Sequence, residues 1–308
     1  MRRYISPNCR HQGSSLIELL IAFCLSFGVL LAAISTLQSA NSSFIWLEQA
    51  ATLQDNGSYA LNLIAQAIRQ STYIDYTQSI DERYLIPEDG AVWGADARSV
   101  KSGDFSKAVL DQHAVNGSDV LVIRFSGADV MANTSVVNCA GFTVNRTNQT
   151  EVDRGWSIFY VALNSFGQPE LRCKYRGNTE WESQAIVSGV ESFQILYGID
   201  SNGDGLANQY LNAAGISKLD LNKNQTDSPW KEVVAIRVSL LLHAPSKKIN
   251  KKEVADKYDL FGSAYAQTYS DEDEGTSIVL NALPAESRGW YLHVVQSIIY
   301  LRTADKPT

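Results

Sequence analysis

The segment from Leu16 to Leu37 is almost wholly apolar, and it constrains the chain more than any other feature. It is long enough to cross a hydrocarbon layer of about 30 Å as an α-helix. Arg2, Arg3 and Arg10 precede it, and positive residues before a membrane segment favour the cytoplasmic side. The sequence therefore predicts a membrane-anchored chain whose larger, following part is exported.

One carboxylate, Glu18, stands near the start of this apolar segment. An isolated carboxylate at bilayer depth costs about 2.5 kcal/mol or more unless it is paired, so such a residue indicates a function. A secretory signal peptide has the same order of basic and apolar regions, and Ala32, Ala40 and Ser42 are small residues of the kind found at cleavage sites. That alternative stays open on the pattern alone, but it leaves Glu18 unexplained.

The stretch "GSSLIELLIA", which begins at Gly13, resembles the signature of type IV prepilins. In that family a basic leader ends in Gly, and a Glu stands fifth after the cleavage point. The resemblance implies a leader over residues 1–13, cleavage between Gly13 and Ser14, and N-methylation of Ser14 by a prepilin peptidase. Ser14 departs from the Phe that is commonest at this position. The resemblance also implies that Glu18 pairs with the methylated terminal amine of a neighbouring subunit and so sets the register between subunits.

The chain after the leader is expected to begin with one long helix of two parts. Residues 14–40 form its transmembrane half, and residues 41–71 form its amphipathic half. Asn56-Gly57 interrupts the second half at a cost of about 1 kcal/mol relative to Ala, which predicts a bend or local melting. The apolar stripe of this half recurs at three- and four-residue steps, at Leu47, Ala51, Leu61, Ile64, Ala65 and Ile68.

Residues 72–308 are expected to form a globular β-rich domain. Runs rich in Val, Ile, Tyr and Phe, bounded by turn residues, predict strands within residues 117–127, 156–164, 170–177, 189–200, 231–244 and 289–303. A long helix ahead of these strands predicts an α+β, type IV pilin-like fold, in which an antiparallel sheet packs on the helix. Two polar connections, 76–107 and 246–277, are predicted to be surface loops. The charge runs 247–252 and 271–274 are expected to be solvated.

The helix tail "ALNLIAQAIRQS" and the blocks "SGVESFQILYGIDSNGDG", "EVVAIRVSLLL" and "VVQSIIYLR" resemble the PilW family of minor pilins. This resemblance implies an inner-membrane subunit with its globular domain in the periplasm, which primes or caps a type IV pilus at its tip or base. The implied partners are other minor pilins, the major pilin, the prepilin peptidase and a tip adhesin. A J-like pseudopilin of type II secretion is the alternative within the same machinery. A membrane-tethered exported enzyme or binding module is the alternative from another class.

Cysteine usage is consistent with export. Cys9 falls in the leader and Cys24 in the membrane segment, which leaves Cys139 and Cys173 in the exported part. In an oxidising compartment these two can close a disulfide that contributes about 3 to 4 kcal/mol by loop-entropy estimates. Two free thiols are the alternative, because separation along the chain says nothing about distance in space.

The stretch "GIDSNGDGLANQY" matches the first half of the Asp-x-Asn-x-Asp-Gly calcium loop. The template assigns calcium ligands to Asp200, Asn202, Asp204, the backbone carbonyl of Leu206, and Asn208. The twelfth position is Leu211, where the template has a bidentate Glu, so the site is expected to be weak or to need another carboxylate, such as Asp220. The alternative is an Asx-rich β-turn that holds no ion.

Composition limits the partners and the reactions of the chain. The formal net charge of −7 disfavours nucleic acid, because phosphate binding needs clustered Lys and Arg. The four histidines are scattered, and no metalloprotease, nucleophile-elbow, phosphate-loop or Cys-x-x-Cys motif occurs. His243 and His293 lie in strand-like runs and are expected to be packing residues. We therefore expect a binding protein that has no catalytic residues and requires no cofactor. Calcium is the one ion that the sequence suggests as a ligand.

Overall fold

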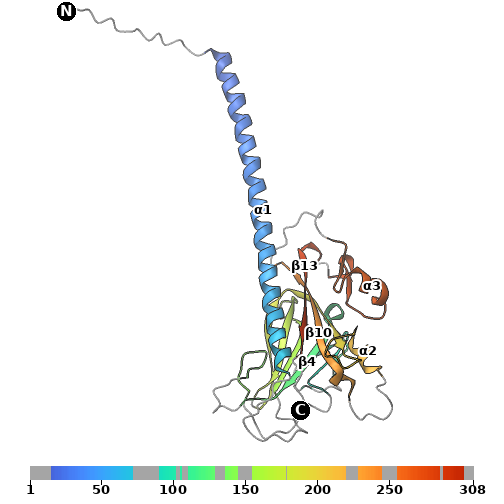
Figure 1. Cartoon of the computed structure of the whole chain (residues 1–308). Coiled ribbons are helices and arrows are strands. Elements are labelled where there is room, and N and C mark those ends of the chain that lie inside the picture. The colour runs from blue at the N-terminus through green and yellow to red at the C-terminus, as the bar shows by residue number, and fades with distance from the viewer. Residues whose placement is uncertain are drawn as a thin grey trace, which may run out of the picture. The chain divides into compact units, whose positions relative to one another are not determined.

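The computed structural model describes residues 15–71, 90–101, 105, 110–128, 136–144, 155–177, 179–219, 228–244, 255–284 and 287–301. The chain divides into two compact units, Met1–Ala50 and Ala51–Thr308. Helix α1 (Leu16–Gln70), blue in Figure 1, is a single helix of 55 residues that runs through the boundary between them. The predicted long N-terminal helix is therefore present.

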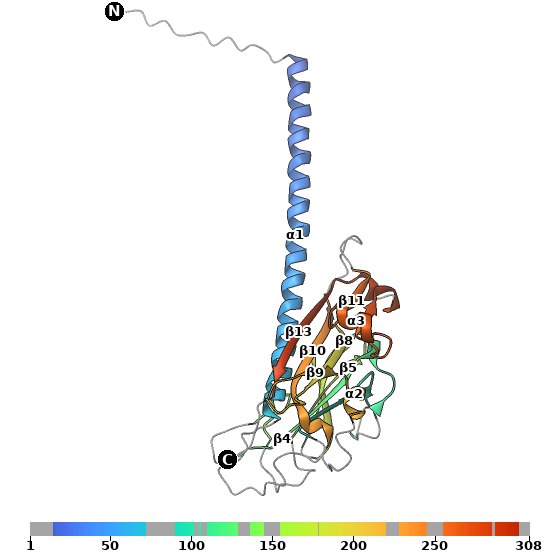
Figure 2. The ribbon, with the colours of Figure 1, turned by 45° about the vertical axis from the view of Figure 1, so that its right-hand side comes forward.

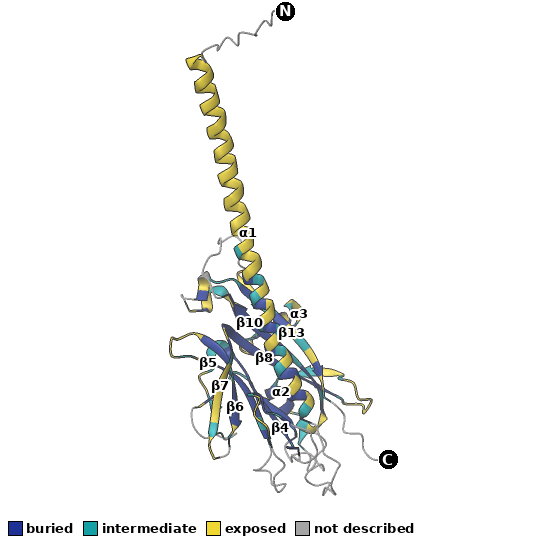
Figure 3. Cartoon of the chain, turned by 90° about the vertical axis from the view of Figure 1, so that its left-hand side faces the viewer, coloured by how far each residue is buried: buried dark blue, intermediate teal, exposed yellow. Residues whose placement is uncertain are grey.

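The part of α1 in the first unit has the composition of a membrane span. Residues 15–44 are all exposed, as the yellow helix in Figure 3 shows, and Glu18 is the single charged residue within residues 15–47. Among the residues that the structure describes, α1 is the one helix long and apolar enough to cross a membrane. Its exposed leucines, isoleucines and phenylalanines are the surface expected of a lipid-facing helix.

The part of α1 in the second unit buries one stripe. Ile64, Ala65 and Ile68 are buried as predicted, whereas Leu47 and Ala51 are exposed, so that part of the prediction is wrong. The stripe begins at Leu53 instead and continues through Gly57, Ala60 and Ala67. These positions recur every three or four residues, so they share one helix face. Of the expected bend or local melting at Asn56-Gly57, the local melting is wrong, because the helix continues through both residues.

The described residues of the second unit form two larger antiparallel sheets and two small ones. The five-stranded sheet has the order β1 (Val92–Ala95), β4 (Val120–Phe125), β5 (Gly155–Leu163), β6 (Pro169–Arg176) and β7 (Trp181–Ser188). The four-stranded sheet, seen in Figure 2, has the order β13 (Leu292–Tyr300), β10 (Val233–His243), β8 (Val190–Ile199) and β9 (Gln209–Leu211). The two small sheets pair β2 (Ser99–Val100) with β3 (Leu110–Asp111), and β11 (Lys257–Asp259) with β12 (Ser277–Val279).

Short helices complete the unit. In the part of the unit that the structure describes, α2 (Ala213–Ser217) and α3 (Ser263–Tyr269) are α-helical. The 3-10 turns are η3 (Val115–Gly117), η6 (Pro229–Glu232), η7 (Leu280–Ala282) and η8 (Ser287–Gly289). All six predicted strands are present, and the predicted α+β class is confirmed. The expectation of one sheet is wrong, since the strands divide between two.

The main core lies between α1 and the two larger sheets. Its buried members come from the helix, the five-stranded sheet and the four-stranded sheet, for example Ile64, Ile68, Leu121, Phe159, Phe193 and Ile236. β8 is buried along its whole length, as the dark blue strands in Figure 3 show. The continuous apolar run of β4 has a physical reason: Val120 and Val122 point to a second core on the opposite face of the sheet, because side chains alternate along a strand.

Both predicted surface loops contain regular structure. Within 76–107 the structure places β1, whose Trp93 is buried in the second core. Within 246–277 it places β11 and α3, and Leu260 joins a third core under β10. Short strands bounded by polar residues carry too little periodicity to stand out from loops, which is why these predictions were wrong. The basic run 247–252 lies outside the described residues.

Candidate functional site

Glu18 lies in the first turn of α1, where it caps the helix. The backbone N–H of Ser15 donates to Glu18 Oε2 at 3.0 Å, and the backbone N–H of Glu18 donates to the Ser15 carbonyl at 2.9 Å. This reciprocal pattern satisfies a donor that the helix itself leaves open, and a negative charge is favourable at a helix N-terminus. The structure thus shows a local role for the carboxylate that the sequence analysis did not consider. Gly13 and Ser14 lie outside the described residues.

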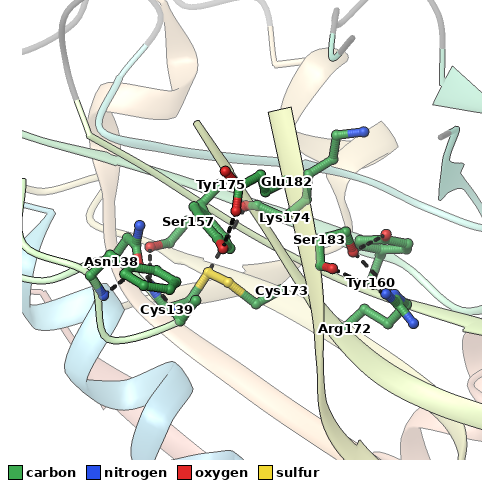
Figure 4. The surroundings of a disulfide bond; sticks show 12 residues. Asn138, Cys139, Ser157, Tyr160, Arg172, Cys173, Lys174, Tyr175, Glu182 and Ser183 are labelled. Carbon is green, nitrogen blue, oxygen red and sulfur yellow. Dashed lines mark hydrogen bonds between the residues drawn. A yellow bond between two sulfur atoms is a disulfide. The ribbon is translucent and has the colours of Figure 1, made fainter. Parts of the chain in front are cut away.

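Cys139 and Cys173 are joined by a disulfide with a Cα–Cα distance of 5.9 Å (Figure 4). The bond ties the short segment 136–144 to β6, and both cysteines are buried. The backbone N–H of Cys139 also donates to Ser157 Oγ on β5 at 2.9 Å. The closed loop spans 34 residues, for which the loop-entropy estimate is about 4 kcal/mol.

The surroundings of this disulfide are held by side chains of β6 and β7 (Figure 4). Tyr175 OH donates to Glu182 Oε2 at 2.8 Å, and the Tyr175 ring lies 5.3 Å from the ring of Phe142. Burial, together with the hydrogen bond to Glu182, raises the pKa of Tyr175 to about 12. The tyrosine therefore stays neutral at physiological pH and acts as a donor. The cluster packs beside the disulfide and links Phe142 to β6 and β7.

The proposed calcium loop is an exposed hairpin connection between β8 and β9. Asp200 Oδ1 accepts from the backbone N–H groups of residues 202, 203 and 204 at 3.2, 2.7 and 3.3 Å. Asp200 Oδ2 accepts from the N–H of Gly205 at 2.7 Å. These hydrogen bonds lower the pKa of the Asp200 carboxyl, and the bond from Gly205 has the largest effect. The arrangement is that of an Asx turn.

The other proposed ligands are also hydrogen-bonded within the loop. Asp204 Oδ1 accepts from the N–H of Leu206 at 2.8 Å, and Asp204 Oδ2 accepts from Asn202 Nδ2 at 3.0 Å. Asn208 Oδ1 accepts from the N–H of Ser201 at 3.0 Å. The side-chain oxygens therefore accept hydrogen bonds within the loop itself, as in a turn that holds no ion. Calcium binding stays a prediction. The further candidate, Asp220, lies outside the described residues.

Asp119 connects the two larger sheets, and the sequence analysis missed it. Its backbone N–H donates to the Phe193 carbonyl on β8 at 2.8 Å, and its Oδ2 accepts from the N–H of Ile195 at 2.9 Å. Its Oδ1 accepts from the N–H of Ala97 at 3.0 Å. The side chain is only 2% exposed, and burial raises its pKa well above the usual range, with two nearby aspartates adding to the effect. No sequence signal distinguishes Asp119 from an ordinary turn residue before a strand.

Those two aspartates are Asp96 and Asp273. Asp96 accepts from the first two backbone N–H groups of α2 at 2.8 and 2.7 Å. Asp273 accepts from Asn212 Nδ2 and from Tyr265 OH, both at 2.8 Å. Burial is the main cause that raises the pKa of each carboxyl. Asp273 is 2% exposed, so the expectation that the whole run 271–274 is solvated is wrong. Among the described residues, no group of three or more His, Cys, Asp or Glu side chains could hold a metal ion.

Glu191 at the start of β8 and His243 at the end of β10 form a buried pair. Glu191 Oε1 lies 2.8 Å from His243 Nδ1, and the two side chains are 1% and 8% exposed. Glu191 Oε2 also accepts from Asn116 Nδ2 at 3.1 Å. His243 is thus a partnered, packed residue, as expected from the sequence. The sequence alone could not identify Glu191 as the partner of His243, because the two residues are far apart in the chain.

The C-terminal half of the chain is similar to a known protein family. Residues 158–302 match the family model described as PilW, Type IV Pilus-assembly protein W. This region is similar to PilW. The PilW-like region runs from β5 to the end of β13 and includes the Glu191–His243 pair and the 200–208 loop. It leaves out α1 with Glu18, and Cys139. The predicted resemblance to the family is therefore confirmed over this part of the chain.

Other comparisons add less. A type IV-like pilin from Thermus thermophilus is 14% identical, with a TM-score of 0.38, over 81% of this chain and 96% of that chain. No match was found among curated protein sequences.

Proposed function

We propose that the chain is a minor pilin that primes or caps a type IV pilus through subunit–subunit binding. The observation that carries this proposal is the PilW match over residues 158–302, in a chain that begins with the Gly13-to-Glu18 pattern and an apolar helix. The subunit is anchored in the inner membrane by α1, with the second unit in the periplasm, and it moves to the pilus tip or base on assembly. Its work is binding, not catalysis.

The proposed partners follow from this role. A prepilin peptidase cuts between Gly13 and Ser14 and methylates the new terminal amine. Other minor pilins and the major pilin then bind along α1, and a tip adhesin is a further partner. Glu18 pairs with the terminal amine of a neighbouring subunit, because a buried charge alone is costly, whereas a buried pair is tolerated. This role competes with the capping hydrogen bond from Ser15 seen in the single chain.

The two roles of Glu18 can be separated by charge. Glu18→Gln keeps a side-chain oxygen that can accept from Ser15 but removes the charge, whereas Glu18→Ala removes both. We expect both variants to be cleaved and inserted, and both to yield at least about tenfold fewer pili, since breaking a buried pair costs several kcal/mol. Glu48→Gln, the next carboxylate along α1, is the control and should leave pilus number unchanged. Wild-type numbers of pili in cells with Glu18→Gln would reject the pairing role and leave capping.

Leader removal tests the prepilin assignment itself. The N-terminus of the wild-type protein, measured by mass spectrometry of membrane extracts, is expected to be methylated Ser14. Gly13→Glu is expected to retain residues 1–13, because the peptidase needs a residue without a side chain at the cut. A mature N-terminus near Ala40 would instead show the secretory signal that the sequence left open. Normal maturation of the Gly13→Glu variant would also contradict the assignment.

A further inference from the structure

A groove of about 540 Å³ opens on the second unit, between α1 and the end of β7. Its volume lies in the range of roughly 300–1,000 Å³ that is typical of small-molecule sites. The helix contributes Asn56 and Tyr59, the turn before β6 contributes Gln168, and His243 and Trp290 also line the groove. All of these residues lie within Ala51–Thr308, so the groove belongs to one compact unit.

The lining of the groove combines polar, aromatic and small apolar side chains. None of its residues is Asp, Glu, Lys or Arg; they are amide, hydroxyl, aromatic and small apolar residues together with His243. An ionic ligand would leave its charge without a counter-charge there, which is unfavourable away from water. The composition therefore favours a neutral ligand that makes several hydrogen bonds.

His243 presents one nitrogen to this groove. Its Nδ1 is held by Glu191 at 2.8 Å, and because a carboxylate only accepts, Nδ1 carries the proton. Nε2 has no hydrogen-bond partner among the described residues, although the side chain is only 8% exposed. Gly189, with φ +81°, keeps the approach open, because a β-carbon there would lie 3.2 Å from Nε2. The ring is thus fixed in orientation, with Nε2 available to a ligand.

Further groups converge on the same space. The side-chain amides of Asn56 and Gln168 have no hydrogen-bond partner among the residues that the structure describes, and each can both donate and accept. The Trp290 ring centre lies 4.2 Å from that of His243, and Tyr59 is 56% exposed. Amide and imidazole groups beside aromatic faces match the alternating hydroxyl and C–H surfaces of a sugar ring.

An extended peptide is the other ligand that such a groove suggests, since β7 is the last strand of its sheet. Strand addition needs a regular row of backbone groups. Here the register shifts between Leu171 and Arg172, which leaves Ile186 opposite no residue of β6. This bulge lies where β7 lines the groove, and bulges twist an edge away from pairing. The geometry therefore disfavours an added strand at this place.

We propose that this groove binds an uncharged saccharide, whose hydroxyls hydrogen-bond Asn56, Gln168 and His243. Trp290 and Tyr59 supply the aromatic surface for the C–H face of the ring. The site does not depend on the pilus role, because all of its groups belong to the folded second unit. It would let the subunit recognise a glycan surface directly.

The test uses the full chain, purified in a detergent without a sugar headgroup. A panel of uncharged probes (glucose, galactose, mannose, N-acetylglucosamine and N-acetylgalactosamine, alone and as disaccharides) is compared with sialylated and sulfated glycans and with uncharged peptides. We expect saturable binding of at least one uncharged saccharide. Asn56→Ala and Gln168→Ala should each weaken it about tenfold, the usual cost of one lost ligand hydrogen bond being near 1.4 kcal/mol. Asn62→Ala and Gln66→Ala, exposed amides on the same helix, are the matched controls and should bind as wild type.

Variants of His243 are unsuited to carry this test, because they leave Glu191 buried without its partner and risk unfolding. The Asn56 and Gln168 variants remove side chains that are not fully buried, and their thermal midpoints should match those of the control variants. Three outcomes overturn the proposal: no uncharged saccharide binds, binding is unchanged in both groove variants, or the peptides or the charged glycans alone bind.

Discussion

Gly57 of α1 lies directly against Val295 of β13: a β-carbon at position 57 would fall 2.9 Å from both γ-carbons of the valine. Packed carbon atoms normally lie about 3.5–4.0 Å apart, so a side chain here would force Val295 or the helix to move. A glycine in mid-helix costs about 1 kcal/mol relative to alanine, and in this fold the close approach of helix and sheet offsets that cost.

Gly57→Ala is therefore expected to destabilise the second unit despite its better helix propensity. Overpacking costs about 1–3 kcal/mol and the propensity gain returns about 1, so the free energy of unfolding should fall by up to about 2 kcal/mol in urea titrations. Val295→Ala makes room for the new methyl group, so the double variant should be more stable, by about 0.5 kcal/mol or more, than the sum of the two single losses predicts. Gly28→Ala, with nothing within 4 Å of its β-carbon, is the control. Full additivity of the two changes would contradict the contact.

Asp119 predicts an unusual pH dependence. Burial raises its pKa well above the ordinary value, so the folded chain holds this proton more tightly than the unfolded chain. The free energy of unfolding should then fall as the pH rises from about 4 through the raised pKa, by about 1.4 kcal/mol for each unit of the shift. Asp119→Asn should flatten this fall between pH 5 and pH 8, as followed by urea unfolding. Asp55→Asn, exposed on α1, should follow the wild-type curve, and a wild-type slope in Asp119→Asn would be evidence against the effect.

Removal of the disulfide should weaken the second unit. The double variant Cys139→Ala and Cys173→Ala is expected to lose about 4 kcal/mol of unfolding free energy, because the unfolded chain regains the freedom of a 34-residue loop. The same loss should follow when the wild type is unfolded in a strong reductant. Cys24→Ala, outside the bridge, is the control. Alkylation of the denatured, unreduced mature chain should label one thiol, and three labelled thiols would exclude the bridge.

The loop 200–208 predicts a proteolysis result. Asp200→Ala removes the acceptor for four backbone N–H groups, so the loop should open and be nicked faster by a calcium-independent protease. Asp271→Ala is the control. If the calcium hypothesis holds, about 5 mM calcium should protect the wild-type loop and produce heat in calorimetry. No protection and no heat would leave the Asx turn as the whole explanation of the motif.

Local signals predicted much of this fold. The apolar run from Leu16 and its basic flank lie within one segment of the chain. The alternating pattern of each long strand and the turn residues that bound it are equally local. The short strands β1, β11 and β12 were missed, because a few residues carry almost no period. Leu47 and Ala51 were assigned to the buried stripe because periodicity shows which residues share a face but not where the partner surface begins.

The sequence by itself determined that the chain has one membrane-length helix carrying a carboxylate, followed by antiparallel strands, since these features depend on neighbouring residues alone. It also offered Cys139 and Cys173 as candidates, but only the fold supplies their 5.9 Å separation. The tertiary structure decided that Gly57 is a contact rather than a break. It also decided that Asp119 joins two sheets and that Glu191 orients His243 toward a groove. The physical reason is that each of these depends on a partner far away in the chain, whose distance no local pattern encodes.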